Sequence, residues 1–304
     1  MTGHTGFLGF PEKLPDGQKP RLVIFGAPYG TEYQGKDSSG YATAAAKIRA
    51  AVAEDAALIE NWDFDLGGPL FNGQVPSCVD TGDLPTRVRN DEGNRELIAA
   101  KTREILSAGA VPIMIGGDDS TPIPFFAGFA ESDPVWILQI DAHIDWREEL
   151  HGGERFGYSS PMRRASEMAH VAGIVQVGMR GLGSARIQEV EDARRYGAKI
   201  VTAREIHAQG IDSAIRHIPQ GARIVITLDC DGLDPSIMPG VVAPTPGGLS
   251  YTQVIELIEA AAARGRIAGF DLVEFHTPSD IANLTALTAA RILVNAIGQI
   301  LRQA

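Results

Sequence analysis

Three ionisable side chains stand at alternate positions in the stretch IDAHID, residues 140–145. They are Asp141, His143 and Asp145, and the apolar run VWIL lies just upstream. Because side chains along a strand alternate between its two faces, an extended backbone would point all three to one side. Carboxylates and an imidazole that share one face can ligate a metal ion. The spacing therefore predicts a polar, ligand-bearing site beside a buried strand.

Short apolar runs rich in Val and Ile alternate with segments of helical period along the chain. This pattern is typical of a parallel sheet covered by helices on both faces. The predicted strands are 21–26, 77–82, 111–117, 135–141, 173–178, 199–202, 223–229 and 268–273. The predicted helices lie near 41–56, 92–108, 120–131, 160–171, 184–196, 209–217, 250–264 and 281–303. The fold class is therefore α/β with eight strands.

The composition is that of a globular protein. Of the 304 residues, 44% are hydrophobic and 21% are charged, and no internal repeat, low-complexity tract or linker is visible. We therefore expect a single domain over residues 21–304. Residues 1–20 are expected to form an N-terminal arm over the surface or at an interface.

Charge and cysteine content exclude several classes of function. Lys+Arg 27 against Asp+Glu 38 gives a net charge of -11, which is the wrong sign for a nucleic-acid binder or a polybasic membrane-surface protein. Two cysteines, Cys78 and Cys230, argue against a disulfide framework. The N-terminus has no basic region followed by an apolar run, and no window approaches about 18 uncharged apolar residues. We expect a cytoplasmic protein without a membrane span.

Acidic residues follow four predicted strands, in GGDDS (116–120), IDAHID (140–145), LDCDGLDP (228–235) and VEFH (273–276). Ligand sites of doubly wound sheets lie beyond the carboxyl ends of the strands, so these segments should converge. One Asp at a strand end is most often a cap or turn former. That interpretation fails for the set, because so many carboxylates would repel one another in a partly desolvated cleft. The set comprises Asp118 or Asp119, Asp141, His143, Asp145, Asp229, Asp231 and Glu274.

Divalent metal ions would neutralise such a cluster. Oxygen-rich ligation with one imidazole and no thiolate motif favours Mn(II), with Ni(II), Co(II) or Fe(II) as alternatives. There are more carboxylates than one ion needs, which indicates two ions with bridging carboxylates. A pair of this kind can generate a hydroxide that attacks an electrophilic carbon.

The motifs around these residues resemble those of the ureohydrolases, the family of arginase, agmatinase and the guanidino-acid hydrolases. The matching landmarks, in order, are GGDDS, DAHID, QVGMRG (176–181), LDCDGLDPSIMPG (228–240), PGGLS (246–250) and DLVEF (271–275). The resemblance covers about residues 20–303 and is closer to the agmatinase branch. It implies a three-layer α/β/α, arginase-like fold with a mainly parallel sheet, a binuclear manganese site, hydrolysis of a small cationic guanidino substrate to urea and an amine, and assembly into trimers or hexamers.

The resemblance also implies a role for each candidate residue. One metal would be held by Asp119, Asp141, Asp145 and Asp229, and the other by Asp141, His143, Asp229 and Asp231, so that Asp141 and Asp229 bridge. Glu274 would pair with the substrate guanidinium. Asp145 would also handle the proton of the attacking hydroxide.

The chain departs from the family pattern at several of these positions. Asp119 stands where the family usually has histidine, which makes one metal site all-carboxylate. With five aspartates, two dications and a hydroxide the centre would carry about -2, one unit more negative than with histidine, and would be a weaker Lewis acid. Tyr158 replaces a histidine thought to shuttle protons or meet substrate, and His151 is the candidate substitute. VAPTPGG (242–248) and His276 change the expected pocket wall.

These observations leave two main hypotheses. The first is a binuclear-metal amidinohydrolase acting on a guanidino, guanidine or biguanide-like compound, with formimino hydrolysis as a more remote variant. The second is a catalytically weak or inactive paralogue that binds a guanidinium ligand or serves as a partner subunit in a mixed assembly.

Overall fold

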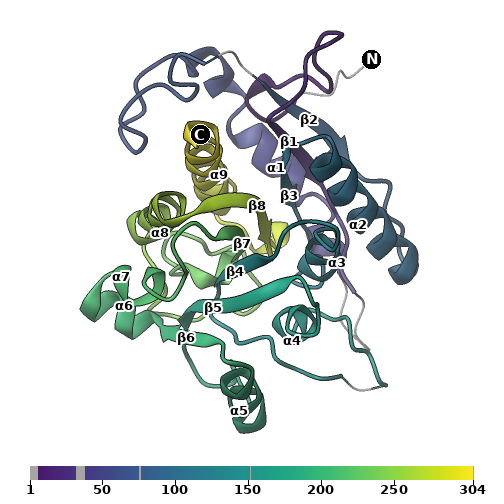
Figure 1. Ribbon diagram of the computed structural model, residues 1–304, viewed down its shortest axis with the longest axis vertical. Coiled ribbons are helices and arrows are strands. Elements are labelled where there is room, and N and C mark those ends of the chain that lie inside the picture. The colour runs from purple at the N-terminus through teal and green to yellow at the C-terminus, as the bar shows by residue number, and fades with distance from the viewer. Residues whose placement is uncertain (1–5, 32–37, 75–76, 151, 304) are drawn as a thin grey trace.

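A computed structural model describes residues 6–31, 38–74, 77–150 and 152–303 of the chain (Figure 1). Its centre is an eight-stranded sheet of order β2-β1-β3-β8-β7-β4-β5-β6, in which every strand pairing is parallel. The strands are β1 (Leu22–Gly26), β2 (Cys78–Asp83), β3 (Val111–Ile115), β4 (Val135–Ile140), β5 (Val171–Met179), β6 (Lys199–Thr202), β7 (Arg223–Asp229) and β8 (Arg266–Val273). The predicted α/β class and all eight predicted strands are confirmed.

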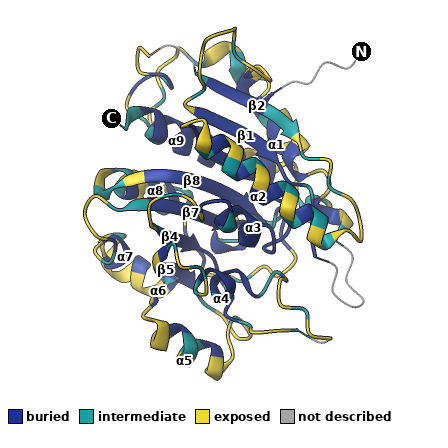
Figure 2. Cartoon of the chain, turned by 45° about the vertical axis from the view of Figure 1, so that its right-hand side comes forward, coloured by how far each residue is buried: buried dark blue, intermediate teal, exposed yellow. Residues whose placement is uncertain are grey.

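Helices cover both faces of the sheet and bury one apolar cluster against each face (Figure 2). One face carries α1 (Ala44–Ala51), α6 (Ala203–Gln209), α7 (Asp212–Ile215), α8 (Tyr251–Arg264) and α9 (Leu284–Arg302). The other carries α2 (Asp91–Ser107), α3 (Pro122–Ala127), α4 (Pro161–Ala165) and α5 (Ile187–Tyr196). Short 3-10 turns, η1 to η5, span Phe7–Gly9, Ser39–Tyr41, Glu54–Leu58, Cys230–Gly232 and Thr277–Ser279. The architecture is therefore the predicted three-layer α/β/α arrangement.

Two helix predictions were wrong in detail. The helix expected near 160–171 ends at Ala165, because β5 begins at Val171. In place of one helix near 209–217, the chain forms α6 and α7, separated at Gly210, whose φ is 77°. The start of α6 has a sequence signal, since Thr202 and Glu205 form a capping box with reciprocal hydrogen bonds.

The strand order explains why the acidic segments meet. β3, β8, β7 and β4 are consecutive neighbours in the sheet, and these are the four strands that the acidic segments follow. In register, Ile115 lies opposite Leu272, Asp229 opposite Val273, and Ile140 opposite Leu228. Because all four strands run in the same direction, their carboxyl ends lie at one edge of the sheet.

In the segment predicted to form an N-terminal arm, three of the described residues lie in the hydrophobic core. Phe7, Leu8 and Phe10 are buried in the cluster beneath α1 and α9. The backbone N–H of Phe7 donates to Asp80, a fully buried carboxylate that also accepts two hydrogen bonds from Arg49 on α1, at 2.7 and 2.9 Å. One buried ion pair thus links the arm, the first helix and the edge strand β2.

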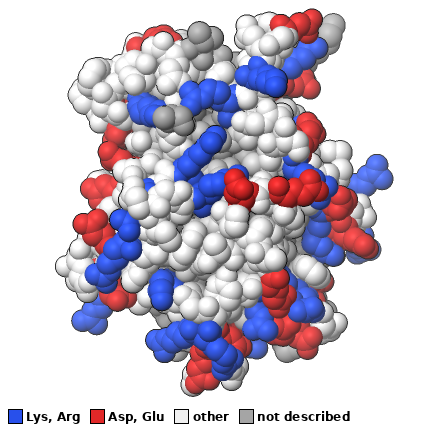
Figure 3. All heavy atoms as spheres, in the orientation of Figure 1, with Lys and Arg blue, Asp and Glu red and all other residues white. Residues whose placement is uncertain are grey.

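The outer surface carries charges of both signs (Figure 3), and the last helix is largely buried. On the face in Figure 3, acidic and basic side chains are interspersed, with uncharged areas between them. Within the described residues, α9 is long and apolar enough to cross a membrane by composition alone, but 78% of its apolar window is buried inside the protein. It packs against α1 and α8 as a core helix.

Replacing Arg49 tests the buried ion pair. Arg49→Met leaves the Asp80 charge in the core without its partner, so the free energy of unfolding should fall by about 3–5 kcal/mol in urea denaturation. The control is Lys101→Met, which removes an exposed pair with Glu104 and should cost at most about 1 kcal/mol. Equal, small effects of both substitutions would show that the Asp80 link does not hold the arm and α1 in place.

Candidate metal centre

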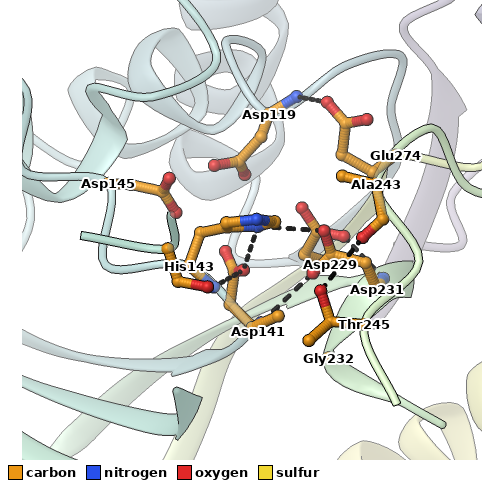
Figure 4. Close-up of polar contacts among 12 residues, drawn as sticks. Asp119, Asp141, His143, Asp145, Asp229, Asp231, Gly232, Ala243, Thr245 and Glu274 are labelled. Carbon is orange, nitrogen blue, oxygen red and sulfur yellow. Dashed lines mark hydrogen bonds and ion pairs between the residues drawn. The ribbon is translucent and has the colours of Figure 1, made fainter. Parts of the chain in front are cut away.

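Two groups of potential ligand atoms lie at the carboxyl edge of the sheet (Figure 4). One group is Asp141, His143 and Asp231, and the other is Asp119, Asp141 and Asp229. Within each group the ligand atoms lie within 4.8 Å of one another. Asp141 belongs to both groups, as a carboxylate that bridges two ions would.

Backbone amides hold these carboxylates in place. The N–H of His143 donates to Asp141 Oδ1 at 2.6 Å, and the N–H of Asp231 donates to Asp229 Oδ1 at 2.7 Å. Asp229 is the last residue of β7 and caps the turn that carries Asp231. The N–H of Ala142 donates to Asp231 Oδ1 at 3.1 Å, which joins the two loops. Each of these donors fixes one oxygen and leaves other lone pairs for a cation.

The buried side-chain amides of Gln139 and Gln176 form a series of hydrogen bonds that ends at the same carboxylates. We call this pair of amides the relay. Gln139 Nε2 donates to Asp141 Oδ2 at 2.7 Å and to Asp145 Oδ2 at 2.6 Å. Gln139 Oε1 accepts from Gln176 Nε2 at 2.6 Å, and Gln176 Oε1 accepts from the indole of Trp146 at 2.9 Å. Gln139 is 2% exposed and Gln176 is fully buried. Because each amide is oriented by the next, this relay sets the direction of both carboxylates.

The electrostatics of the cluster are those of an uncompensated anionic site. Burial raises the pKa of Asp119 well above its usual range, and the Asp145 charge adds to the effect. Burial likewise raises the pKa of Asp229, with repulsion from Asp231 as the next cause. For His143, burial lowers the pKa, but hydrogen bonds to Asp141 and Asp231 outweigh it and raise the pKa to about 12. The carboxylates thus favour a proton on the imidazole, and a metal ion would displace that proton when it binds His143.

The donor set fits divalent ions. Asp119 Oδ2 is buried and has no hydrogen-bond partner among the described residues. A buried, unsatisfied carboxylate oxygen is costly, so its persistence here indicates a position meant for a cation. Four carboxylates and one imidazole form a hard, oxygen-rich set that suits manganese-type ions and not structural zinc.

A cavity of about 170 Å³ opens directly onto this centre. Its lining includes the carboxylates of Asp119, Asp229, Asp231 and Glu274 and the hydroxyl groups of Tyr41 and Tyr158. This volume is below the roughly 300–1,000 Å³ of sites for drug-sized ligands, so the cavity fits a smaller compound.

Glu274 is held between two donors from distant parts of the chain. Its Oε1 accepts the N–H of Asp119 at 2.8 Å, and its Oε2 accepts the hydroxyl of Tyr41 at 2.5 Å. Tyr41 packs edge-on against His276, with ring centroids 5.6 Å apart. The backbone of Glu274 has φ 63° and that of Asp145 φ 52°, in the left-handed region that side chains other than glycine rarely adopt. Such strain is typical of functional positions.

The predicted site residues occupy different places in this arrangement. Five of the six predicted metal ligands come together, namely Asp119, Asp141, His143, Asp229 and Asp231. Asp145 lies beside them in the cavity wall but outside both ligand groups. Glu274 and Tyr158 also line the cavity, whereas His151 lies outside the described residues. The expectation that His276 forms pocket wall was wrong, since Tyr41 lines the cavity and His276 packs against Tyr41.

Sequence reasoning missed two kinds of residue. Gln139 and Gln176 could have been found, because Gln139 stands two positions before Asp141 and shares its strand face. Tyr41 had no local signal, because its contact with Glu274 joins residues 233 positions apart.

Comparison with known proteins agrees with this geometry. The sequence profile described as the arginase family matches residues 20–298. Proclavaminate amidinohydrolase of Streptomyces clavuligerus is 28% identical over 92% of this chain and 89% of its own length. N(1)-aminopropylagmatine ureohydrolase of Thermus thermophilus is 34% identical over 68% of each chain. The solved structure of the Streptomyces clavuligerus amidinohydrolase superposes with a TM-score of 0.83 at 26% identity, covering 100% of this chain and 99% of the other.

The chain therefore belongs to the arginase family, and its fold is the arginase fold. It is a ureohydrolase, a hydrolase of non-peptide C–N bonds in linear amidines. The predicted family resemblance is confirmed.

Removing the inner amide of the relay tests its effect on metal binding. Gln139→Leu keeps the volume but takes the donor from Asp141 and Asp145, so the dissociation constant for Mn(II) should rise about 10- to 100-fold in titration calorimetry. Gln188→Leu, an exposed substitution on α5, is the matched control. Unchanged Mn(II) affinity in Gln139→Leu would show that the relay does not orient the ligands.

The metal-free protein should lose stability as the pH rises. Burial, and next the Asp118 charge, raise the pKa of Glu274 from 4.5 to about 8. The folded state therefore binds more protons than the unfolded state between these values, and the free energy of unfolding falls with rising pH. Urea denaturation in a chelator should show a shallower decline for Glu274→Gln. A free energy of unfolding that increases over this interval would contradict the assigned direction.

Proposed function

We propose that the chain is a binuclear-metal amidinohydrolase that cleaves a guanidino compound into urea and an amine. The observation that carries the proposal is Asp141, which is shared by two ligand groups. The other members of these groups line a small cavity together with Glu274. Two divalent ions, with Mn(II) preferred and Ni(II), Co(II) or Fe(II) as alternatives, would supply the Lewis acid and activate the water nucleophile. Asp119, Asp141, His143, Asp229 and Asp231 would hold them.

Glu274 has the chemistry to bind the guanidinium group. A guanidinium is a planar cation with a fork of donors, and a carboxylate is its natural partner. With Asp119 N–H and the Tyr41 hydroxyl holding its two oxygens, Glu274 presents the remaining lone pairs in a fixed direction. Burial, and next the Asp118 charge, raise the pKa of Glu274. A bound cation opposes this shift, because it stabilises the ionised carboxylate.

Asp145 is placed to handle the proton. Its carboxylate lines the cavity and is oriented by Gln139 Nε2. Burial and the Asp141 charge raise its pKa well above the ordinary value, which makes it a stronger base when it is ionised. Asp145 accepts the proton that water loses as the new C–O bond forms, and returns it to the departing amine nitrogen as the C–N bond breaks. Tyr158 offers a hydroxyl to the substrate in the same cavity.

The proposal includes the oligomeric state of the protein and its cellular location. Large apolar side chains on the described surface, Trp62 at 62% and Phe64 at 90% exposure, support self-association into a trimer or hexamer. A mixed assembly with a paralogue is the alternative. Cys78 and Cys230 are buried, unpaired thiols, which suit a reducing cytoplasmic location.

Urea release from a panel of guanidino compounds, with Mn, Ni, Co and Fe supplied in turn, tests the function. Asp229→Ala should abolish turnover and lower metal content, because it removes a carboxylate proposed to bridge the ions. Asp119→His should change the metal preference, because it exchanges a charged oxygen ligand for a neutral nitrogen.

Two bound ions without turnover of any compound would favour the alternative role of a guanidinium-binding or partner subunit. Normal turnover and metal content in Asp229→Ala would show that the bridge is misassigned. An unchanged metal profile in Asp119→His would show that position 119 is not a ligand.

A further inference from the structure

We propose that Arg147 forms a subsite for an anionic tail, so that the substrates are guanidino acids and not guanidino amines. This inference rests on the proposed hydrolysis of guanidino compounds and specifies the other end of the substrate. Arg147 is the single arginine or lysine among the described residues that line the cavity. It shares that cavity with Glu274, the proposed partner of the guanidinium group.

Local structure brings Arg147 into the cavity wall. It follows Asp145 by two residues, and its backbone N–H donates to the carbonyl of Ser159 at 3.0 Å. That hydrogen bond places Arg147 beside the Tyr158–Ser159 segment, both residues of which line the cavity. Arg147 therefore lies beside a segment that carries two hydroxyl groups, those of Tyr158 and Ser159, in the lining of the cavity.

Glu189 holds the Arg147 side chain. Arg147 Nε donates to Glu189 Oε1 at 3.1 Å. Glu189 is 7% exposed, and its Oε2 accepts the backbone N–H of Arg186 at 2.8 Å at the start of α5. Both oxygens of Glu189 are thus engaged, and the helix fixes their position. Glu189 is a support for Arg147 and is poorly placed to receive a substrate ammonium.

The contact through Nε leaves the two terminal amino groups of Arg147 for a second partner. Among the described residues, its one ion pair is the Nε contact with Glu189. The Arg147 side chain is 22% exposed, so a ligand can reach it while part of the surrounding water is excluded. A carboxylate is the group that matches two parallel N–H donors, and the hydrogen bonds gain strength in a partly desolvated site.

The positive charge of Arg147 distinguishes substrates with a carboxylate tail from substrates with an ammonium tail. A substrate ammonium at this wall would face the Arg147 cation, whereas a carboxylate would be attracted to it. A zwitterion can pair its guanidinium with Glu274 and its carboxylate with Arg147, both of which line the cavity. The geometry thus favours a guanidino acid over an amine-tailed compound of the same length.

The test compares three probes with a four-carbon chain, 4-guanidinobutanoate, agmatine and butylguanidine, which carry an anionic, a cationic and a neutral tail. The wild-type protein should release urea fastest from the acid, judged by kcat/KM. Arg147→Ala should lower kcat/KM for the acid about 10- to 100-fold, mainly through KM, because it removes a charge-assisted pair. Butylguanidine should change less than about twofold.

Matched variants separate recognition from damage to the fold. Arg147→Met keeps the stem of the side chain and should reproduce the loss, and Arg147→Lys should recover part of it. Arg195→Ala removes an exposed arginine on α5, outside the cavity, and should leave all three probes unaffected. Thermal melting and metal content check that each variant is folded and loaded.

Failure of this inference is distinguishable from failure of the proposed function. A preference for agmatine, or equal losses with all three probes in Arg147→Ala, would overturn the anionic subsite while amidinohydrolysis stands. If none of the probes is hydrolysed, calorimetric binding of 4-guanidinobutanoate decides. Binding at least tenfold tighter to the wild-type protein than to Arg147→Met supports the subsite, and equal binding rejects it.

Discussion

Repulsion among buried carboxylates is the constraint on which the structure depends. Asp119, Asp141, Asp145, Asp229 and Asp231 are each less than a tenth exposed and meet at one edge of the sheet. Each like charge in a low-dielectric site raises the free energy of its neighbours. The parallel order β3-β8-β7-β4 nevertheless brings their loops together. Such a convergence is tolerable only where cations bind.

The surrounding residues use their donors to shape this charge. Backbone N–H groups of Ala142, His143 and Asp231 hold single oxygens of the ligand carboxylates. Gln139 reaches two carboxylates from beneath, and Trp146 and Gln176 orient it. These donors satisfy part of each anion without neutralising it. The ligand side chains are therefore held in fixed positions while the site remains anionic. Cations beside His143 and the unsatisfied Asp119 Oδ2 would neutralise this negative charge.

Much of the fold and part of the site could be predicted from the sequence. Apolar strand runs and the acidic segments after them are local signals, and strand topology brings them together. The alternation of side chains along a strand does not explain the position of Asp145. β4 ends at Ile140, and Asp145 takes a left-handed backbone conformation. Tyr41 was not found, since its hydrogen bond to Glu274 depends on the packing of distant segments. The break between α6 and α7 at Gly210 was also missed, although the capping box at Thr202 is a local signal.

Anomalous diffraction from crystals of the manganese-loaded protein tests the central claim most directly. We expect two peaks that share Asp141, with Asp229 as the second proposed bridge, one beside Asp119 and the other beside His143 and Asp231. Water alone among these side chains, in protein saturated with manganese, would contradict the claim that a pair of dications makes the carboxylate cluster stable.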